Sequence, residues 1–191
     1  TVLWNQDLAH DGLQSFDVEM ATIPGRVYIA LTSATDTTGR DLVVLCLDAL
    51  GAPIWERRYS ASSITNYEFL AQMALDGQGR AYVTGYSQDT VQGSMVVLAL
   101  ALDGSIRWVE RAAPGQTVFG THIGCSMNGR VIALGQIMQS GLADGDLLLT
   151  CYDTLGSLLW DQQLSIGGVD LPMDLSIASD GTVFCIGTGT A

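Results

Sequence analysis

The sequence predicts an all-β fold: a β-propeller of four-stranded antiparallel blades, with about four repeats of roughly 52 residues and an incomplete last blade. Three observations support this prediction. The tryptophans recur at nearly even spacing, a glycine-containing turn precedes most of them, and short apolar segments alternate with turn residues throughout. No segment keeps an apolar stripe at helical spacing over three turns, so no helix is expected.

The tryptophans set the period of the repeat. Trp4, Trp55, Trp108 and Trp160 are 51, 53 and 52 residues apart. Each of the last three comes four residues after a glycine, and an aspartate stands shortly before that glycine. These turn glycines are Gly51, Gly104 and Gly156.

Two further markers keep the same period. One is a glycine that precedes an apolar run, at Gly25, Gly79, Gly129 and Gly181, followed by arginine in the first three copies. The other is an aromatic residue at the start of the apolar segment before that glycine. It is present as Phe16, Phe69 and Phe119, and Leu171 replaces it in the fourth copy. Three independent markers at one period identify a repeat protein.

The second repeat shows what one unit forms. Its apolar segments are separated by glycine- and aspartate-rich turns and by the polar stretch 87–93, and four short strands are expected at 69–75, 81–86, 95–102 and 106–111. Segments such as 43–47 and 147–152 are apolar on both faces, which is typical of strands covered on two sides. Stacking of successive blades provides such cover, with the tryptophans as spacers between blades.

The repeats divide the chain into five parts: a lone fourth strand with its link at 1–13, blades at 14–60, 61–113 and 114–165, and a partial blade at 166–191. Fifteen strands are expected, one fewer than four blades need. We therefore expect the chain to be part of a larger propeller, or a partner chain to supply the missing edge.

Composition limits the function. Twenty acidic residues against eight basic ones give a net charge of -12, which argues against binding nucleic-acid phosphates. All eight basic residues are arginine, so no lysine is present for catalysis. The longest apolar run, 95–102, is too short to span a membrane. The sequence begins with threonine instead of methionine and shows no charged and apolar leader. We therefore expect either a processed mature protein or a piece of a longer one.

No catalytic or metal-binding motif stands out. His10 lies in a polar connection and His122 lies within a strand, and both are interpreted as structural. Cys46, Cys125 and the other two cysteines lie in apolar runs and form no CxxC pair, so buried thiols are favoured, with one or two disulfides left open. No cofactor is expected.

The units resemble the SBBP-type β-propeller repeats of bacterial surface and secreted proteins. Residues 76–86 (DGQGRAYVTGY) are close to that family's D-x-x-G-N-x-Y-V-T-G-Y core, and the third strands headed by Asp41 and Asp146 are similar to the family's, whereas the second copy has Ser94 there. The resemblance implies an extracytoplasmic location and no shared catalytic residues. A weaker likeness is to quinoprotein (PQQ) repeats, but this chain lacks the adjacent cysteine pair on which those enzymes stack the quinone.

The loops indicate where binding is expected. In such blades the loops between second and third strands and the links between blades share one face, here long and variable, whereas the turns on the other face are short. Asp36, Asp89 and Asp144 give the long-loop face an acidic rim. The expected function is a non-catalytic structural or protein-binding scaffold. The alternatives are a glycan-binding or enzymatic propeller, and a subunit that assembles through an open edge strand.

Overall fold

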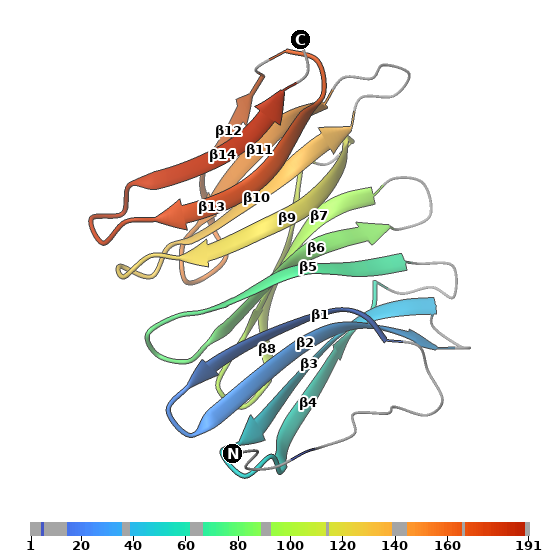
Figure 1. Cartoon of the computed structure of the whole chain (residues 1–191), viewed down its shortest axis with the longest axis vertical. Coiled ribbons are helices and arrows are strands. Elements are labelled where there is room, and N and C mark those ends of the chain that lie inside the picture. Colours follow the sequence, from blue (N-terminus) through green and yellow to red (C-terminus); the bar gives the residue numbers. More distant parts are fainter. Residues whose placement is uncertain are drawn as a thin grey trace.

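A computed structural model describes residue 5 and residues 15–35, 39–61, 67–88, 93–113, 115–138, 145–165 and 167–189. These residues form an all-β structure of antiparallel strands, as the sequence predicts (Figure 1). The strands are β1 (Ser15–Ile23), β2 (Arg26–Thr35), β3 (Gly39–Asp48), β4 (Pro53–Tyr59), β5 (Tyr67–Leu75), β6 (Ala81–Gln88), β7 (Gly93–Leu100), β8 (Ile106–Ala112), β9 (Thr117–Cys125), β10 (Val131–Met138), β11 (Gly145–Tyr152), β12 (Leu158–Leu164), β13 (Asp170–Ile177) and β14 (Val183–Gly189). Within the described ranges, no helix is long and apolar enough to cross a membrane.

The strands pair in sequence order as three four-stranded units and one hairpin. β1–β4 form the first unit, β5–β8 the second and β9–β12 the third, each an antiparallel meander. β13 and β14 form the C-terminal hairpin. The first two units are joined by a single parallel pair between Arg40 and Tyr67, so they are not fully separate sheets.

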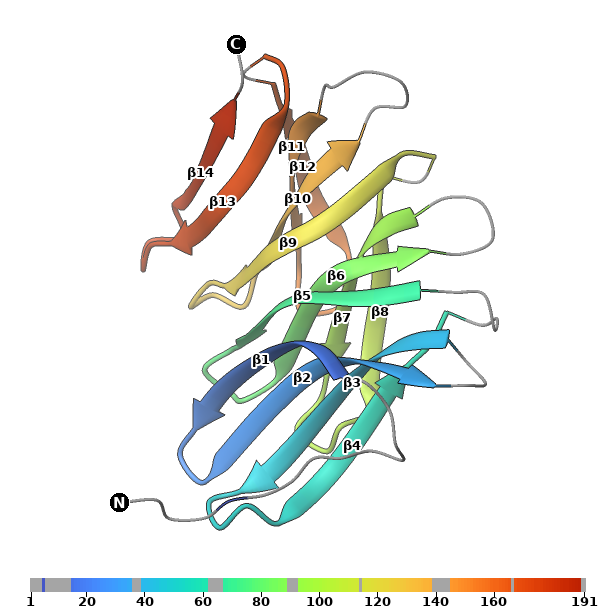
Figure 2. The ribbon, with the colours of Figure 1, turned by 45° about the vertical axis from the view of Figure 1, so that its right-hand side comes forward.

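The units lie one after another along the long axis of the molecule (Figure 1). Buried apolar clusters fill each interface: one between the first and second units, one between the second and third, and one between the third unit and the hairpin. β13 packs across β9, β10 and β11 (Figure 2). Because the second and third units are covered on both faces, third strands such as β11 are buried along their whole length.

The turns between the first and second strands share one geometry in the second unit, the third unit and the C-terminal hairpin, whereas the first unit has a two-residue turn between Ile23 and Arg26. In the second unit the Gly79 N–H donates to the Asp76 carbonyl at 2.9 Å, and the Asp76 N–H donates to the Arg80 carbonyl at 3.1 Å. The same pair of hydrogen bonds recurs at 126–130 and 178–182. Gly79 has φ +77°, a conformation that other residues adopt only with strain.

In the second unit, the third unit and the C-terminal hairpin, a β-bulge in the first strand faces a glycine on the second strand. The β5–β6 register shifts between Leu70 and Gln72, which brings the Phe69 carbonyl close to Gly85. A Cβ at Gly85 would lie 1.9 Å from that carbonyl oxygen. Gly135 and Gly187 face the carbonyls of their own first strands in the same way. The recurring glycine is therefore a packing requirement of the backbone.

Several strand ends differ from the prediction. β6 continues through Ser87 and Gln88, and β7 begins at Gly93, although this stretch is polar. The same holds in the first unit, where β2 reaches Thr35 and β3 begins at Gly39. Ladder pairing uses backbone groups, so polar residues extend these strands without leaving an apolar signal. The lone fourth strand expected within residues 1–13 lies outside the described residues, apart from residue 5.

Candidate functional site

The first and second units are joined by a contact between a tryptophan and a turn. Trp55 of β4 donates its indole Nε1–H to the Leu102 carbonyl at 2.9 Å, in the turn between β7 and β8. Its ring lies against Gly104, where a Cβ would come within 2.6 Å of the indole carbon Cδ2. Gly104 also has φ +79°. This position therefore needs glycine both for its backbone and for the space that the indole occupies.

The second and third units repeat this Trp–Gly contact. Trp108 of β8 donates its indole N–H to the Thr154 carbonyl at 3.2 Å, and a Cβ at Gly156 would lie 2.8 Å from the indole Cγ. Arg107 donates a second hydrogen bond to the same carbonyl at 2.7 Å. The accepting carbonyl lies two residues before the turn glycine at both junctions. The same Trp–Gly contact thus joins successive units at two junctions.

A tyrosine from the second strand supports each indole. Tyr28 meets Trp55 edge-on, with ring centroids 5.8 Å apart, and its hydroxyl donates to the Gly79 carbonyl of the next unit at 2.9 Å. Tyr82 lies 5.9 Å from Trp108. Both tyrosines are almost completely buried, so the aromatic pairs belong to the cores between units.

Of the remaining tryptophan and glycine markers, Trp160 and Gly51 lie within the described residues. Trp160 of β12 is half-buried and belongs to the cluster between the third unit and the hairpin. Gly51 is buried in the turn between β3 and β4, with φ +83°. Trp4 lies outside the described residues.

A buried polar network lies at the other end of the strands, where the long loops emerge. Glu68, at the start of β5, is fully buried. Its Oε1 accepts hydrogen bonds from the Ser87 hydroxyl at 3.1 Å and from the Ala61 N–H at 3.3 Å. Arg111 donates to the same Ser87 hydroxyl at 2.9 Å and so links β8 to the network.

Burial raises the pKa of Glu68 to about 7. The hydrogen bonds from Ser87 and Ala61 oppose this rise, whereas the charge of Asp41 adds to it. Asp41 is itself fully buried at the start of β3, and Arg58 binds its Oδ2 at 2.8 Å. The junction between the first two units therefore holds two buried carboxyl groups with arginines beside them.

The corresponding positions differ at the other junctions. Between the second and third units, Ser94 and Val118 replace the acids, and Tyr86 stacks on Phe119 with ring centroids 4.3 Å apart. Between the third unit and the hairpin the acids return: Gln163 donates to buried Asp146, and Asp170 is fully buried. The loop-bearing ends of the sheets thus hold buried carboxyl groups at two junctions and an aromatic stack at one.

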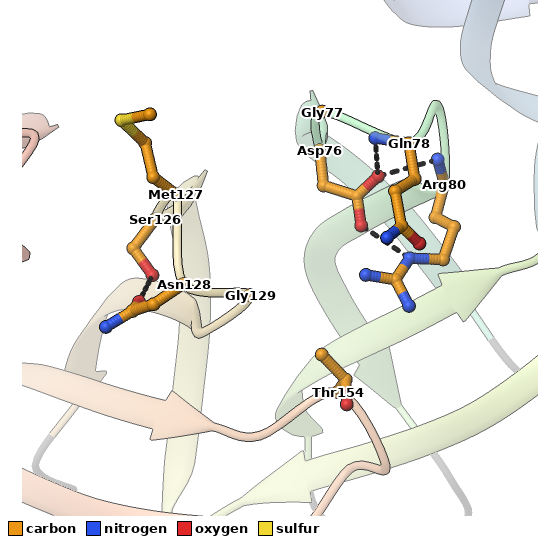
Figure 3. A pocket seen from close by; sticks show the side chains of 9 residues that line it. All are labelled: Asp76, Gly77, Gln78, Arg80, Ser126, Met127, Asn128, Gly129 and Thr154. Atoms are coloured by element: carbon orange, nitrogen blue, oxygen red, sulfur yellow. Dashed lines mark hydrogen bonds and ion pairs between the residues drawn. The ribbon is translucent and has the colours of Figure 1, made fainter.

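The opposite, short-turn face carries a pocket of about 420 Å³ between the second and third units. Figure 3 shows its lining, in which the turns at 76–80 and 126–129 flank the space and Thr154 lies below them. Gln78, Asn128 and Thr154 provide amide and hydroxyl groups, and Arg80 provides a guanidinium. The lining therefore combines hydrogen-bond donors and acceptors.

Asp76 holds one wall of this pocket in place. Its Oδ1 accepts the N–H groups of Gln78 and Arg80 at 2.9 and 3.0 Å, and its Oδ2 accepts the Arg80 side chain and, at 3.2 Å, the Tyr82 hydroxyl. Burial raises the pKa of Asp76, but these hydrogen bonds outweigh burial and hold the pKa below its usual value. In the third unit Ser126 takes this place, and its hydroxyl accepts the Arg130 N–H at 3.0 Å.

The residues predicted for the binding rim, Asp36, Asp89 and Asp144, all lie outside the described residues. His122 is half-buried, with its Nδ1 3.1 Å from the Thr121 hydroxyl, and His10 lies outside the described residues. The cysteines Cys46, Cys125, Cys151 and Cys185 are all free thiols. Among the described residues, no three His, Cys, Asp or Glu side chains are grouped to hold a metal ion.

Sequence reasoning missed the network around Glu68. Its partners come from the link before β5, from the end of β6 and from β8, so no local pattern connects them. One signal was available: Glu68 is one of only four glutamates in a chain with sixteen aspartates, and it directly precedes the marker Phe69.

Comparisons with known proteins support the fold alone. No protein-family model matches the chain, and no curated protein matches it. An apocarotenoid oxygenase variant from Synechocystis, with a propeller-type fold, is similar in structure, with a TM-score of 0.51 and 14% identity over 82% of this chain. A protein of unknown function from Bacteroides caccae has a TM-score of 0.47 and 14% identity over 91% of this chain. The chain spans only 40% and 53% of these two proteins.

Proposed function

We propose that this chain is a non-catalytic β-propeller module of an extracytoplasmic protein, related to SBBP-type repeats, which serves as a scaffold for protein binding. The observation that carries the proposal is the repeated Trp–Gly contact, which fixes each sheet to the turn of the next. A contact that recurs once per unit, with face-to-face packing of the sheets, is what a propeller of repeated blades requires. The likeness in fold to the apocarotenoid oxygenase variant supports the same arrangement.

The exposed end of the array supports further blades. Phe184 and Ile186 of β14 are 57% and 63% exposed. Their counterparts in β2, Tyr28 and Ala30, are completely buried against the second unit. The outer face of the C-terminal hairpin thus has the apolar character of a face that meets another sheet. We propose that the units belong to a ring in which this face is covered.

The buried acid favours a structural role over catalysis. A carboxyl group with a pKa near 7 is a candidate general base, but Glu68 is fully buried and its Oε1 is bound to Ser87 and Ala61. The network fixes the ends of the strands from which the long loops leave. A rigid frame beneath variable loops suits partner recognition.

We propose that the partner is a basic protein surface, because the chain carries a net charge of -12 and the long loops hold Asp36, Asp89 and Asp144.

The test of a basic partner uses deca-arginine as the probe, at about 0.1 M salt, with binding measured by calorimetry. The triple variant D36N/D89N/D144N is expected to weaken binding at least ~5-fold. The control D48N/D103N/D153N removes three charges from the short-turn face and is expected to bind as the parent chain does. Equal weakening by both variants would show that only net charge matters and would contradict the proposed rim.

The pocket on the short-turn face favours a second candidate, which is binding of a neutral sugar. Gln78 and Asn128 belong to turns on opposite sides of the space, and Thr154 adds a hydroxyl (Figure 3). Such a lining matches the alternating donors and acceptors of sugar hydroxyls. Titration with ~10 mM glucose or N-acetylglucosamine, followed by the NMR signals of the two side-chain amides, tests this. Shifts that disappear in N128A support the pocket, and unshifted amide signals would exclude it for these sugars.

A further inference from the structure

A small cavity lies between the fourth strand of the second unit, β8, and the last two strands of the third unit, β11 and β12. It has a volume of about 170 Å³, far more than the ~10–15 Å³ that one water molecule needs. Its lining combines two carboxyl groups, two hydroxyl groups and aliphatic side chains, which belong to Glu110, Asp161, Thr150, Tyr152, Leu148 and Leu158. The cavity therefore has room and polar groups for a small ligand.

The corresponding place between the first and second units is apolar. Thr150 pairs with Asp161 in the register of β11 and β12, as Leu98 pairs with Val109 in β7 and β8. Leu98 is buried in the cluster between the first two units, and Val109 packs against that cluster. The third unit thus carries a hydroxyl and a carboxyl group where the second unit has aliphatic side chains.

The charge at this place also differs between the two junctions. In the first unit Arg57 lies two residues after the tryptophan, and its Nε donates to the Gly104 carbonyl at 2.7 Å. In the second unit that position is Glu110, which lines the cavity together with Asp161. Neither carboxylate has an ion-pair partner in the part of the chain that the structure describes. Two carboxyl groups thus share one cavity with no cation bound to either.

The hydroxyl of Thr150 is buried without a partner. Thr150 is 3% exposed, and its Oγ1 makes no hydrogen bond of normal geometry, although Tyr152 carries a hydroxyl on the same face of β11. Arg111 also lines the cavity, but its Nη2 donates to the Ser87 hydroxyl in the network around Glu68. An unpaired buried hydroxyl costs free energy, so its presence indicates a bound ion or molecule that supplies the missing hydrogen bond.

We propose that this cavity is a binding site for a primary alkylammonium group. The ammonium carries a positive charge and three N–H donors, for which Glu110, Asp161 and the Thr150 hydroxyl are the acceptors. The alkyl chain lies against Leu148 and Leu158, and Tyr152 adds an aromatic wall that suits a cation. This inference goes beyond the proposed scaffold function, because the site lies between two units and uses no residue of the acidic rim.

A metal ion fits this lining less well. Ca²⁺ takes roughly six to eight oxygen ligands. The side-chain oxygens here come from two carboxyl groups and two hydroxyls, and aliphatic side chains form much of the remaining wall. Over the described ranges, no three His, Cys, Asp or Glu side chains are grouped to hold a metal ion. An ammonium group needs fewer acceptors and brings an alkyl chain for the aliphatic wall.

The test adds pentylamine, up to ~10 mM, to the full chain labelled with ¹³C and ¹⁵N at about 0.1 M salt, and follows the NMR signal of the Thr150 methyl group. We expect a saturable shift with pentylamine and none with 1-pentanol, which has the same alkyl chain without the charge. E110Q/D161N is expected to weaken amine binding at least ~10-fold. The control D103N/D180N removes two charges from exposed aspartates of the short turns and is expected to bind as the parent chain does.

T150V separates binding from folding. It replaces the unpaired hydroxyl with a methyl group, so we expect at least ~5-fold weaker amine binding together with a higher urea midpoint of the chain without ligand. A hydroxyl that only stabilises the fold would give a lower midpoint. Binding in T150V is followed on the ring signals of Tyr152.

Three results would overturn the inference. The first is no saturable response to pentylamine, or an equal response to 1-pentanol. The second is amine binding that is unchanged in both E110Q/D161N and T150V. The third is saturable binding of Ca²⁺ at Thr150 with no response to the amine, which would assign the cavity to a metal ion.

Two further probes distinguish the source of the ammonium group. Nα-acetyl-lysine N-methylamide carries it on a protein side chain, and cadaverine carries it on a small free diamine, and both are expected to shift the same signals. Tighter binding of the lysine derivative assigns the site to a protein partner, and tighter binding of cadaverine assigns it to a free amine. The variant D36N/D89N/D144N is expected to bind pentylamine as the parent chain does, so failure of the acidic rim and failure of this cavity are distinguishable.

Discussion

The indole of Trp55 occupies the space in which a side chain at Gly104 would lie. A Cβ on Gly104 would be 2.6 Å from Cδ2 of Trp55 and 2.7 Å from Cε3, although the two residues belong to different units. The indole N–H meanwhile binds the Leu102 carbonyl of the same turn. Packing and hydrogen bonding therefore act together at one point, and the same relationship links Trp108 to Gly156.

Replacement of Gly104 by alanine is expected to cost more than replacement of a comparable glycine elsewhere. Gly25 has nearly the same φ, +81° against +79°, but no atom lies within 4 Å of where its Cβ would be. G25A therefore measures backbone strain alone, of about 1 kcal/mol, and G104A adds about 1–3 kcal/mol of overpacking. Urea denaturation of both variants checks the difference. Equal losses would show that Trp55 does not fill the space over Gly104.

At the second junction, the ring of Trp108 is expected to matter more than its N–H. W108F keeps most of the buried surface, and the Thr154 carbonyl still accepts a hydrogen bond from Arg107, so a loss of about 1 kcal/mol is expected. W108A also removes the packing on Gly156 and is expected to cost about 3–5 kcal/mol. The free energies of unfolding of the two variants test this order. A W108F variant as unstable as W108A would contradict it.

Glu68 is expected to make the protein less stable as the pH rises. Its pKa is raised from the ordinary 4.5 to about 7, so the folded state binds its proton more tightly than the unfolded state does. This contribution to stability is complete below about pH 4.5 and is lost as the pH rises to about 7, on the order of 3 kcal/mol in total. E68Q is expected to flatten the fall in unfolding free energy over this range. S87A removes a hydrogen bond that lowers the pKa, and the fall is then expected at higher pH. An E68Q profile parallel to that of the parent chain would exclude Glu68 as the cause.

Asp76 is expected to act in the opposite direction. Its pKa is lowered from the ordinary 3.8 because several N–H groups bind its carboxylate, so its contribution is present above that value and is lost as the pH falls through the folded-state pKa. D76N is expected to cost about 1–3 kcal/mol at pH 7 and less at about pH 3. D180N, in the corresponding turn of the C-terminal hairpin, is the control and is expected to cost less, because the Asp180 side chain is exposed and binds the Thr182 N–H. A loss in D76N that does not depend on pH would argue against a charged Asp76.

The parts of the fold that could be predicted are those with a periodic signal in the chain. The positions of Trp55 and Trp108 indicate repeated antiparallel units without any knowledge of contacts, because a repeat must use the same residue at the same place. The strand ends at Ser87 and Thr35 carry no such signal, because backbone pairing continues under polar side chains. Glu68 could not be connected to Ala61, Ser87 and Arg111, because these residues come from different strands and links. The acidic rim at Asp36, Asp89 and Asp144 stays a prediction.

A double-mutant cycle between Trp55 and Gly104 tests the stacking of units most directly. If the indole fills the space over the glycine, W55A removes the overlap, and G104A in that background is expected to cost only as much as G25A does. The coupling free energy is then about 1–3 kcal/mol, whereas W55A and G156A, at different junctions, are expected to be additive. An equal cost of G104A with and without Trp55 would contradict the contact on which the proposed propeller rests.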